Sequence, residues 1–357
     1  MDVVADAQDC IHFAHRLLKS LSAPFTVGSG QSVQISASVG IAIYPDHGRG
    51  DELLVRADAA MYAAKRAGRA NFALFEPHMI AGAREQLSLQ TELHQAVALG
   101  QLQLYYQPKL DSVTNAITGV EALIRWNHPV HGLVEPDAFI PIAERCGLIR
   151  ALGDWVITEA CRQMRAWLDQ GLHMPVAINV SPWQFREAGL VGHIQRALQR
   201  HALLPSQLLC EITESASMDD VAGTQQVFKE MAQAGVFLSI DDFGTGYSNL
   251  GSLRRLPVRQ LKIDRSFVSN LEANPDTRAI VDAVIHLAHA LDLRVVAEGV
   301  ETSAERDVLC SLRCDELQGY FFAKPMPADA LVVWVKQHHT GTPAGRTAVV
   351  ELSTVSQ

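Results

Sequence analysis

The sequence predicts an α/β fold in which a long C-terminal block forms a (β/α)8 TIM-like barrel and a shorter α/β block precedes it. The chain has 357 residues, which is the length of about two domains. Apolar residues make up 48% and charged residues 19%, a composition typical of a globular protein with a sizeable core. Eight short apolar runs recur over about 250 residues, the size of such a barrel. A doubly wound open sheet remains the alternative, because counting strands does not separate the two folds.

The shorter block is predicted over residues 1–78. Its apolar spacing indicates a helix, a strand-like run, an Ala-rich helix and a final strand, over 11–21, 33–45, 50–68 and 71–75. A domain of this size can bury only a marginal core. A change to polar, helical composition predicts a linker helix over 79–90.

The barrel block is predicted over residues 91–337. Its runs rich in Val, Ile and Leu lie at 102–108, 119–126, 175–181, 208–213, 236–243, 260–264, 294–300 and 316–323. Most are separated by amphipathic stretches such as 155–171 that are long enough for a helix, and this alternation predicts parallel strands. A polar stretch over 338–357 predicts a flexible tail.

Acidic or amide side chains end nearly all of these runs. They are Glu121, Asn179, Glu211, Asp241, Asp242, Asp264, Glu298 and Gln318, with Lys262 beside them. The carboxyl ends of parallel strands in a barrel meet at one face, so these groups should converge. Converging carboxylates need positive charge between them, and ligands that are all oxygen favour Mg²⁺ or Mn²⁺ over zinc.

Each of these residues also has a simpler interpretation. An acidic residue after a strand is often a helix cap, and an Asn in such a place often forms a turn. Helix caps and turns explain poorly why so many strands end in an acidic or amide residue. The adjacent carboxylates of Asp241 and Asp242 would also suit a ligand that bridges two metals.

Charge and the chain ends limit the classes of function. The net charge of −9 argues against a nonspecific binder of DNA, although a small anion held by metal ions stays possible. The sequence shows neither an export signal nor an apolar run long enough for a membrane helix, so a cytoplasmic location is predicted. The six cysteines are accordingly expected to be reduced and mostly buried.

Several motifs of the long block occur in the order typical of one family. EALIRWNHPVHG begins at Glu121, and it is followed by NVSPWQF, EITES, DDFGTGYSNLGSL, LKIDRSFV, VVAEGVET and CDELQGYFFAKPMP. The block therefore resembles EAL domains, the bacterial phosphodiesterases of cyclic di-GMP. The resemblance implies a barrel whose first strand is antiparallel to the rest. It also implies hydrolysis of this second messenger to linear pGpG with two divalent cations, Mg²⁺ or Mn²⁺.

The resemblance implies roles for individual residues. The metal ligands would be Glu121, Asn179, Glu211, Asp241, Asp242 and Glu298, with Asp241 as the bridge. Lys262 would help to position the attacking water. Lys262, Glu121 and Glu298 are the residues predicted to be catalytic.

Further roles lie at the rim of the site. Arg125, Gln318 and Glu301 match positions that face the substrate, and Glu214 matches a residue that anchors the loop over 241–250. This loop is expected to be mobile. A homodimer through the loop face is also possible by resemblance.

The shorter block resembles the C-terminal half of a GGDEF domain, the fold of diguanylate cyclases. The resemblance is carried by VQISASVGIAIYPDHGRGDELLVRADAAMYAAKRAGRANFALFEP, in which Lys65 and Arg69 match positions that face nucleotide phosphates. The GGDEF signature itself does not occur, so cyclase activity is not expected.

Two other functions remain as alternatives to the phosphodiesterase. One is a catalytically silent module that binds cyclic di-GMP and signals through a partner, and the other is a scaffold for protein interactions. Loss of metal ligands would mark the silent module, and none is lost here.

Overall fold

The computed structural model describes residues 7–22, 25–27, 31–33, 36–66, 70–185, 189–218, 222–245, 253–254 and 256–340. The chain divides into two compact units, Met1–Leu93 and His94–Gln357, and each is described by itself. No helix in the described part of the chain combines the length and the apolar character that crossing a membrane requires.

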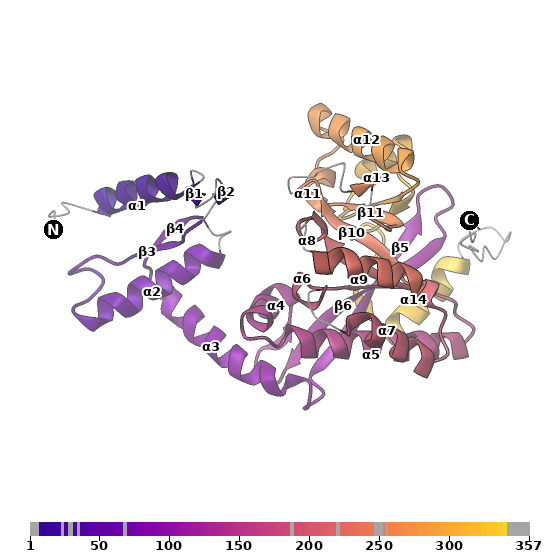
Figure 1. The fold of residues 1–357 in the computed structure, drawn as a ribbon, viewed down its shortest axis with the longest axis horizontal. Helices are drawn as coiled ribbons and strands as arrows, with labels where there is room; N and C mark the ends of the chain where they lie inside the picture. Colours follow the sequence, from indigo (N-terminus) through magenta and orange to yellow (C-terminus); the bar gives the residue numbers. More distant parts are fainter. Residues whose placement is uncertain are drawn as a thin grey trace. The chain divides into compact units, whose positions relative to one another are not determined.

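The N-terminal unit is a small α/β assembly (Figure 1). Its elements are α1 (Ala7–Leu21), β1 (Phe25–Val27), β2 (Gln31–Val33), β3 (Val39–Ile41), α2 (Asp51–Arg66), β4 (Phe72–Leu74) and α3 (His78–Ala96). Strands β1 and β2 pair antiparallel, whereas β3 and β4 pair parallel. The strand-like run predicted over 33–45 thus contains the last residue of β2 and the short strand β3, and the predicted linker helix lies within α3.

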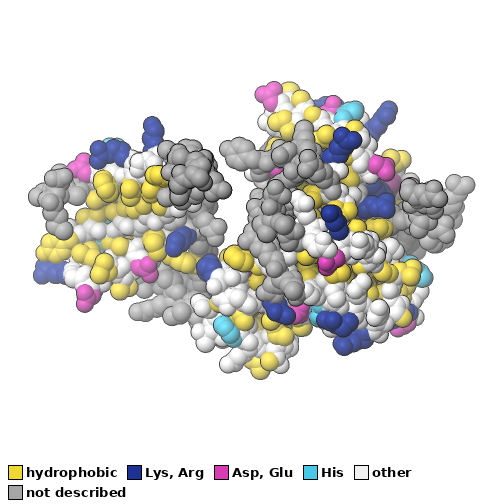
Figure 2. Space-filling view, in the orientation of Figure 1, with side chains coloured by type: hydrophobic (Ala, Val, Ile, Leu, Met, Phe, Trp, Pro, Cys, Tyr) yellow, Lys and Arg dark blue, Asp and Glu magenta, His cyan; other side chains and the backbone are white. Residues whose placement is uncertain are grey.

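Close packing of β3 on α2 explains the glycine in the strand-like run. A Cβ atom on Gly40 would lie 1.9 Å from the carbonyl oxygen of Ala57, so no other residue fits there. The buried cluster of this unit consists of Ala59, Ala60 and Phe75. Hydrophobic side chains also lie on the surface of the unit (Figure 2), among them Phe13, Leu54 and Val55.

The C-terminal unit is built on a closed barrel of eight strands (Figure 1). The strands are β5 (Leu102–Asp111), β6 (Ile117–His128), β8 (Val176–Asn179), β9 (Leu208–Thr213), β10 (Phe237–Phe243), β11 (Gln260–Ile263), β12 (Arg294–Ala297) and β13 (Glu316–Leu317). Around the barrel their order is β5-β13-β12-β11-β10-β9-β8-β6, and the pairing of β5 with β6 closes it. The predicted barrel is confirmed, and the open sheet is excluded.

Strand β5 is antiparallel to both of its neighbours, as the resemblance implied. Its partners are β6 on one side and β13 on the other, and the strands from β6 and β8 to β13 run parallel. Two short strands, β7 (Gly132–Val134) and β14 (Met326–Pro327), add antiparallel pairs to β6 and β5.

Helices follow most of the parallel strands. They are α4 (Pro136–Arg145), α5 (Ile149–Asp169), α6 (Pro182–Phe185), α7 (Leu190–Arg200), α8 (Glu214–Met218), α9 (Ala222–Gln233), α11 (Arg265–Val268), α12 (Pro275–Ala290), α13 (Ser303–Ser311) and α14 (Ala328–Thr340), with a 3₁₀ turn at Pro205–Gln207. Strand interiors such as Val176–Ile178 are buried, because parallel strands in a barrel are covered on both faces.

Two predicted boundaries differ from the structure. The run over 316–323 forms a strand only at Glu316–Leu317, because the chain turns at Gly319, where a Cβ atom would lie 2.1 Å from the carbonyl oxygen of Val300. The predicted tail begins inside α14, which continues to Thr340. The rest of the tail, 341–357, lies outside the described residues.

Candidate metal centre and active site

The barrel interior holds one buried ammonium group surrounded by four carboxylates. The Nζ atom of Lys262 lies 2.6 Å from Glu298 Oε1, 2.7 Å from Glu211 Oε2, 3.2 Å from Asp241 Oδ1 and 3.6 Å from Glu121 Oε2. Lys262 is 1% exposed. A second buried ammonium, that of Lys109, lies 3.2 Å from Glu211 Oε1, but two positive charges still do not neutralise four carboxylates, so the group carries an excess of negative charge.

Strand register brings these side chains together from distant parts of the sequence. Glu211 of β9 is paired with Asn179 of β8, and Asp241 follows two residues after Ser239, the partner of Glu211 on β10. Lys262 comes from β11, and Glu298 follows β12 directly. Side chains two residues apart on a strand share a face, so all of these positions can point into the barrel.

The predicted convergence is therefore confirmed in space, but not always at strand ends. Glu121 lies in the middle of the twelve-residue strand β6, and Lys262 lies inside β11. Asp264 takes the simpler of its two predicted roles. Its side chain caps α11 by accepting a hydrogen bond from the Ser266 N–H at 3.0 Å.

Two amides hold Glu121 in place. Asn179 Nδ2 donates to Glu121 Oε1 and Gln318 Nε2 donates to Glu121 Oε2, both at 2.7 Å. Gln318 Nε2 also donates to Gln107 Oε1 at 3.2 Å. The side-chain amide oxygen of Gln318, Oε1, is buried and has no hydrogen-bond partner among the described residues. Gln318 thus joins the cluster through its amide nitrogen.

Asp241, Asp242 and Glu298 form the described group best arranged for a cation. Each offers one carboxylate oxygen, and these oxygens lie within 4.8 Å of one another. Asp242 has a φ of +54°, an αL conformation that aspartate adopts more readily than most residues. The backbone N–H of Asp242 donates to Asp241 Oδ1 at 3.0 Å, which holds the Asp241 carboxylate against the backbone of Asp242.

Burial and like charge shift the acidities of this group. Burial raises the pKa of Glu211 to about 7 against the opposing charge of Lys262, and Glu121 and Asp241 raise it further. Burial and the charge of Asp241 raise the pKa of Asp242 to about 6. Burial also holds the pKa of Glu298 well above its usual range.

The pKa values of Glu121 and Lys262 shift in the directions that keep both side chains charged. Burial works against the charge of Glu121, but Lys262 and the Gln318 amide outweigh it and lower its pKa to about 2. Burial likewise works against the charge of Lys262, and the surrounding carboxylates hold its pKa well above the usual value. Raised carboxyl pKa values beside these charged groups are the electrostatic mark of a site that needs more positive charge.

Glu214 contacts the start of the loop after the aspartate pair. Its Oε2 accepts a hydrogen bond from the Gly244 N–H at 2.8 Å, and Glu214 is 1% exposed. Gly244 has a φ of +101°, which favours glycine at this bend. The loop over 246–252 lies outside the described residues, so its predicted mobility stays a prediction.

Two of the three predicted substrate-facing residues, Arg125 and Glu301, differ from each other in their surroundings. Arg125 is buried, its Nε lies 2.9 Å from Glu135 Oε2, and its guanidinium carbon lies 5.6 Å from the centre of the Tyr105 ring. Glu301 is exposed, and its backbone N–H donates to Glu305 Oε2 at 2.8 Å. Arg125 is thus held in a defined orientation by two neighbours.

The sequence interpretation missed Lys109. This residue of β5 is buried, and its Nζ lies 3.2 Å from Glu211 Oε1. A lysine inside the apolar run LQLYYQPKL was the available signal, because an unpaired ammonium is rarely buried. The roles predicted for all of these site residues stay predictions.

Comparison with known proteins identifies the class. Residues 90–325 match the model of the EAL domain, and residues 2–71 match that of the diguanylate cyclase, GGDEF domain. The chain belongs to the EAL domain family, and both predicted resemblances are confirmed.

Individual relatives can also be named. The bifunctional diguanylate cyclase/cyclic di-GMP phosphodiesterase MucR of Pseudomonas aeruginosa is 48% identical over 92% of this chain and 48% of its own length. Cyclic di-GMP phosphodiesterase PdeR of Escherichia coli is 39% identical over 91% of this chain and 49% of its own length. The chain thus spans about half the length of these relatives.

Solved structures agree with the barrel. The PaMucR phosphodiesterase in complex with c-di-GMP matches with a TM-score of 0.66 and 48% identity over 68% of this chain and 99% of that one. The EAL enzyme Bd1971, in its form with cAMP and cyclic di-GMP bound, matches with a TM-score of 0.68 and 36% identity, over 71% of this chain and 70% of that one.

Proposed function

We propose that this chain is a metal-dependent phosphodiesterase that hydrolyses cyclic di-GMP to linear pGpG. The observation that carries the proposal is the cluster of four carboxylates around Lys262, with the Asp241 and Asp242 pair at its edge. The proposed substrate class, cyclic di-GMP, is supported by the names of the relatives MucR and PdeR. It is also supported by the c-di-GMP bound in the PaMucR structure.

The donor set fits divalent cations of the Mg²⁺ or Mn²⁺ type. The side chains of Asp241, Asp242 and Glu298 offer only oxygen, which is typical of sites for these hard cations. Asn179, Glu121 and Glu211 would complete the ligands of a second cation. Two such cations supply a water that is nucleophilic at neutral pH and stabilise the charge on a phosphoryl group.

The protein's own residues would orient the reaction. Lys262 carries a buried positive charge at the point where the carboxylates meet, so it can orient a water and stabilise negative charge that develops on phosphate. Arg125, held by Glu135 and Tyr105, offers a guanidinium to a phosphate at the rim. The Asn179 and Gln318 amides fix the orientation of Glu121.

Hydrolysis measurements test this proposal. The full chain should convert cyclic di-GMP to pGpG with Mg²⁺ or Mn²⁺, and Glu121→Ala should remove that activity. Glu316→Ala is the matched control, because Glu316 is a buried carboxylate of the same barrel whose contacts are with Gln260 and Arg294 instead. A folded protein that binds the nucleotide without turnover with either metal would support a silent binding module instead.

Three further parts of the proposal go with it. The choice between Mg²⁺ and Mn²⁺, the cytoplasmic location and the homodimer through the loop face each stay predictions. Metal titration of the hydrolysis rate and sedimentation of the purified chain would measure the first and the last.

A further inference from the structure

Lys109 is a buried cation that the proposed reaction does not yet use. It lies on the antiparallel strand β5 and is 4% exposed, and its Nζ is 3.2 Å from Oε1 of Glu211. The side chain of Glu211 is fully buried. Burying an ammonium group is costly unless it is paired, so this contact is a defined feature of the barrel interior.

The two oxygens of Glu211 are divided between two lysines. Lys109 contacts Oε1 at 3.2 Å and Lys262 contacts Oε2 at 2.7 Å. The terminal torsion of a glutamate side chain has a broad energy profile, so a single contact leaves the carboxylate free to turn. Contacts on both oxygens, from the two different strands β5 and β11, restrict the plane of the carboxylate.

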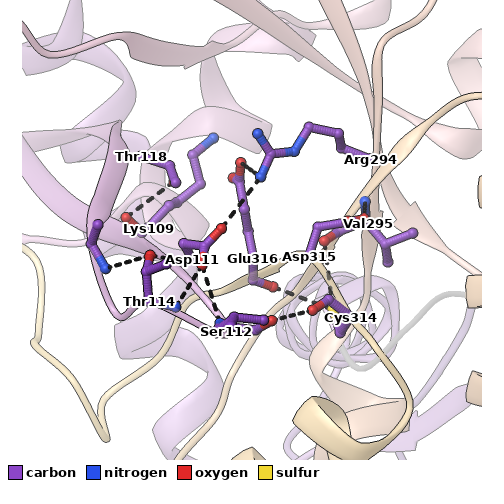
Figure 3. Close-up of polar contacts among 12 residues, drawn as sticks. Lys109, Asp111, Ser112, Thr114, Thr118, Arg294, Val295, Cys314, Asp315 and Glu316 are labelled. Carbon is purple, nitrogen blue, oxygen red and sulfur yellow. Dashed lines mark hydrogen bonds and ion pairs between the residues drawn. The ribbon is translucent and has the colours of Figure 1, made fainter. Parts of the chain in front are cut away.

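The backbone that carries Lys109 is itself held firmly. Thr118 Oγ1 donates to the carbonyl oxygen of Lys109 at 3.3 Å, as Figure 3 shows. Two residues further along β5, Asp111 lies 4.0 Å from the Arg294 guanidinium, which also lies 3.1 Å from Glu316. A side chain on so well anchored a strand is suited to hold another group in place.

The strand is tied down again just beyond its end. The Ser112 N–H donates to the carbonyl oxygen of Asp315 at 3.0 Å, and the Ser112 hydroxyl donates to that of Cys314 (Figure 3). These contacts join the end of β5 to the segment that leads into β13. None of these hydrogen bonds includes Glu211. The anchoring of β5 and the contact of Lys109 with Glu211 can therefore be perturbed by separate substitutions.

We propose that Lys109 is a positioning residue for the metal centre: by holding Oε1 of Glu211, it keeps Oε2 turned towards Lys262 and the neighbouring carboxylates. The inference rests on the proposed metal-dependent function. Residues that orient a metal ligand are typically worth about 10- to 100-fold in metal affinity.

A simple charge effect predicts the opposite result. A lysine near a cation repels it, so removal of Lys109 would tighten metal binding if its charge were all that mattered. Removal of a positioning contact weakens metal binding, because Glu211 is then free to turn away. The direction of the change therefore distinguishes the two roles.

Metal binding without nucleotide is the primary test. The full chain is stripped with EDTA and titrated with Mn²⁺ by calorimetry, as wild type and as Lys109→Met. We expect Lys109→Met to bind Mn²⁺ about tenfold more weakly. Unchanged or tighter binding would overturn the proposal. If Lys109→Met fails to unfold cooperatively, Lys109→Gln takes its place, with the same expected direction and the same outcome against it.

A double-mutant cycle tests whether Lys109 acts through Glu211. In a Glu211→Gln background the carboxylate is absent, so Lys109→Met should cause no further weakening of Mn²⁺ binding. An equal loss in both backgrounds would show that Lys109 does not act through Glu211, and the proposal would fail.

Arg294→Met provides the matched control for stability. It removes another long cation, paired with the buried carboxylate of Glu316, at a place with no described contact to the metal cluster. We expect a lower melting temperature with Mn²⁺ affinity unchanged within about twofold. A loss of affinity equal to that of Lys109→Met would mean that general destabilisation explains both.

Failure of this inference can be told from failure of the proposed function. A wild-type chain that neither binds Mn²⁺ nor hydrolyses cyclic di-GMP would overturn both. A wild-type chain that does both, beside a Lys109→Met variant that binds Mn²⁺ equally well, would overturn only the role of Lys109.

Discussion

The two units of the chain differ in what they bury. All buried polar and charged side chains among the described residues lie in the barrel unit, from Gln107 to Gln318. The buried cluster of the N-terminal unit is apolar, and each of its two sheets has two strands. A closed barrel has no open edges and can surround a charge with partners from every strand, whereas two-stranded sheets cannot. The buried charged side chains of the described residues therefore occur in the barrel.

The sharpest test of this difference compares two lysines. Lys262→Ala removes the cation from the buried cluster and should lower the hydrolysis rate by about 10²- to 10³-fold. Lys65→Ala removes an exposed lysine of α2 and should leave the rate unchanged within about twofold. Steady-state kinetics with cyclic di-GMP measures both. A comparable loss from Lys65→Ala would mean that the N-terminal unit takes part in hydrolysis.

The next test compares the cores. Phe139 of α4 is fully buried against Trp126 in the barrel unit, so Phe139→Ala should cost about 3–5 kcal/mol of unfolding free energy. Phe75→Ala should cost less, because the core around it is smaller, and should leave hydrolysis within about twofold. Urea unfolding and activity measure the two effects. Loss of hydrolysis in folded Phe75→Ala protein would mean that the core of the N-terminal unit contributes to hydrolysis.

Metal removal should make the unfolding free energy of the barrel depend on pH. The raised pKa values of Glu211 and Asp242, about 7 and 6, stabilise the metal-free protein below about pH 4, and this contribution is lost as the pH rises through 6 and 7. The lowered pKa of Glu121 stabilises the protein equally at pH 5 and at pH 8, because both lie above the ordinary pKa of a glutamate. For Glu211 alone the loss is roughly 3 kcal/mol.

Unfolding of the EDTA-treated chain at pH 5 and pH 8 measures this loss. Mn²⁺ should stabilise the barrel more at pH 8, and Glu211→Gln should flatten the dependence. Equal or greater stability of the metal-free protein at pH 8 would contradict the electrostatic account. The described residues of the N-terminal unit include no buried charge, so its unfolding should not follow this pattern.

A smaller effect is expected at the loop anchor. Glu214→Ala leaves the Gly244 N–H without its acceptor and should lower the hydrolysis rate by about 10-fold, with a loss of about 1–3 kcal/mol in stability. Glu214→Gln retains an acceptor oxygen and should recover most of the rate. Unchanged activity together with a sharp loss of stability would show that Glu214 has a purely structural role.

The smallest effect is expected at the exposed rim of the barrel. The Glu135 side chain is 60% exposed, so its contact with Arg125 resembles the surface pair of Arg56 and Glu52 in the N-terminal unit. Glu135→Gln should raise KM about two- to fivefold with kcat nearly unchanged, because Arg125 would be less well oriented. Glu52→Gln is the control and should change neither. A large fall in kcat in Glu135→Gln would place Glu135 closer to the chemistry than proposed.

Local sequence patterns were sufficient for most of the barrel. Alternating apolar runs and amphipathic stretches predicted its eight strands, and carboxylates at these runs predicted a shared site, which Lys262 and its four partners confirm in space. Short elements were predicted less well, since β13 has only two residues and depends on pairing with β5 and β12.

Neighbours across the barrel required the tertiary structure. The sequence by itself determined the kinds of element, the family and an oxygen-rich set of candidate ligands, because these depend on residue type and on spacing along the chain. Only the closed barrel decided that Lys109 contacts Glu211 and that Lys262 lies among four carboxylates. The physical reason is that closure of the barrel brings together side chains from strands that are not neighbours, such as Lys109 and Glu211, which are 102 positions apart in the sequence.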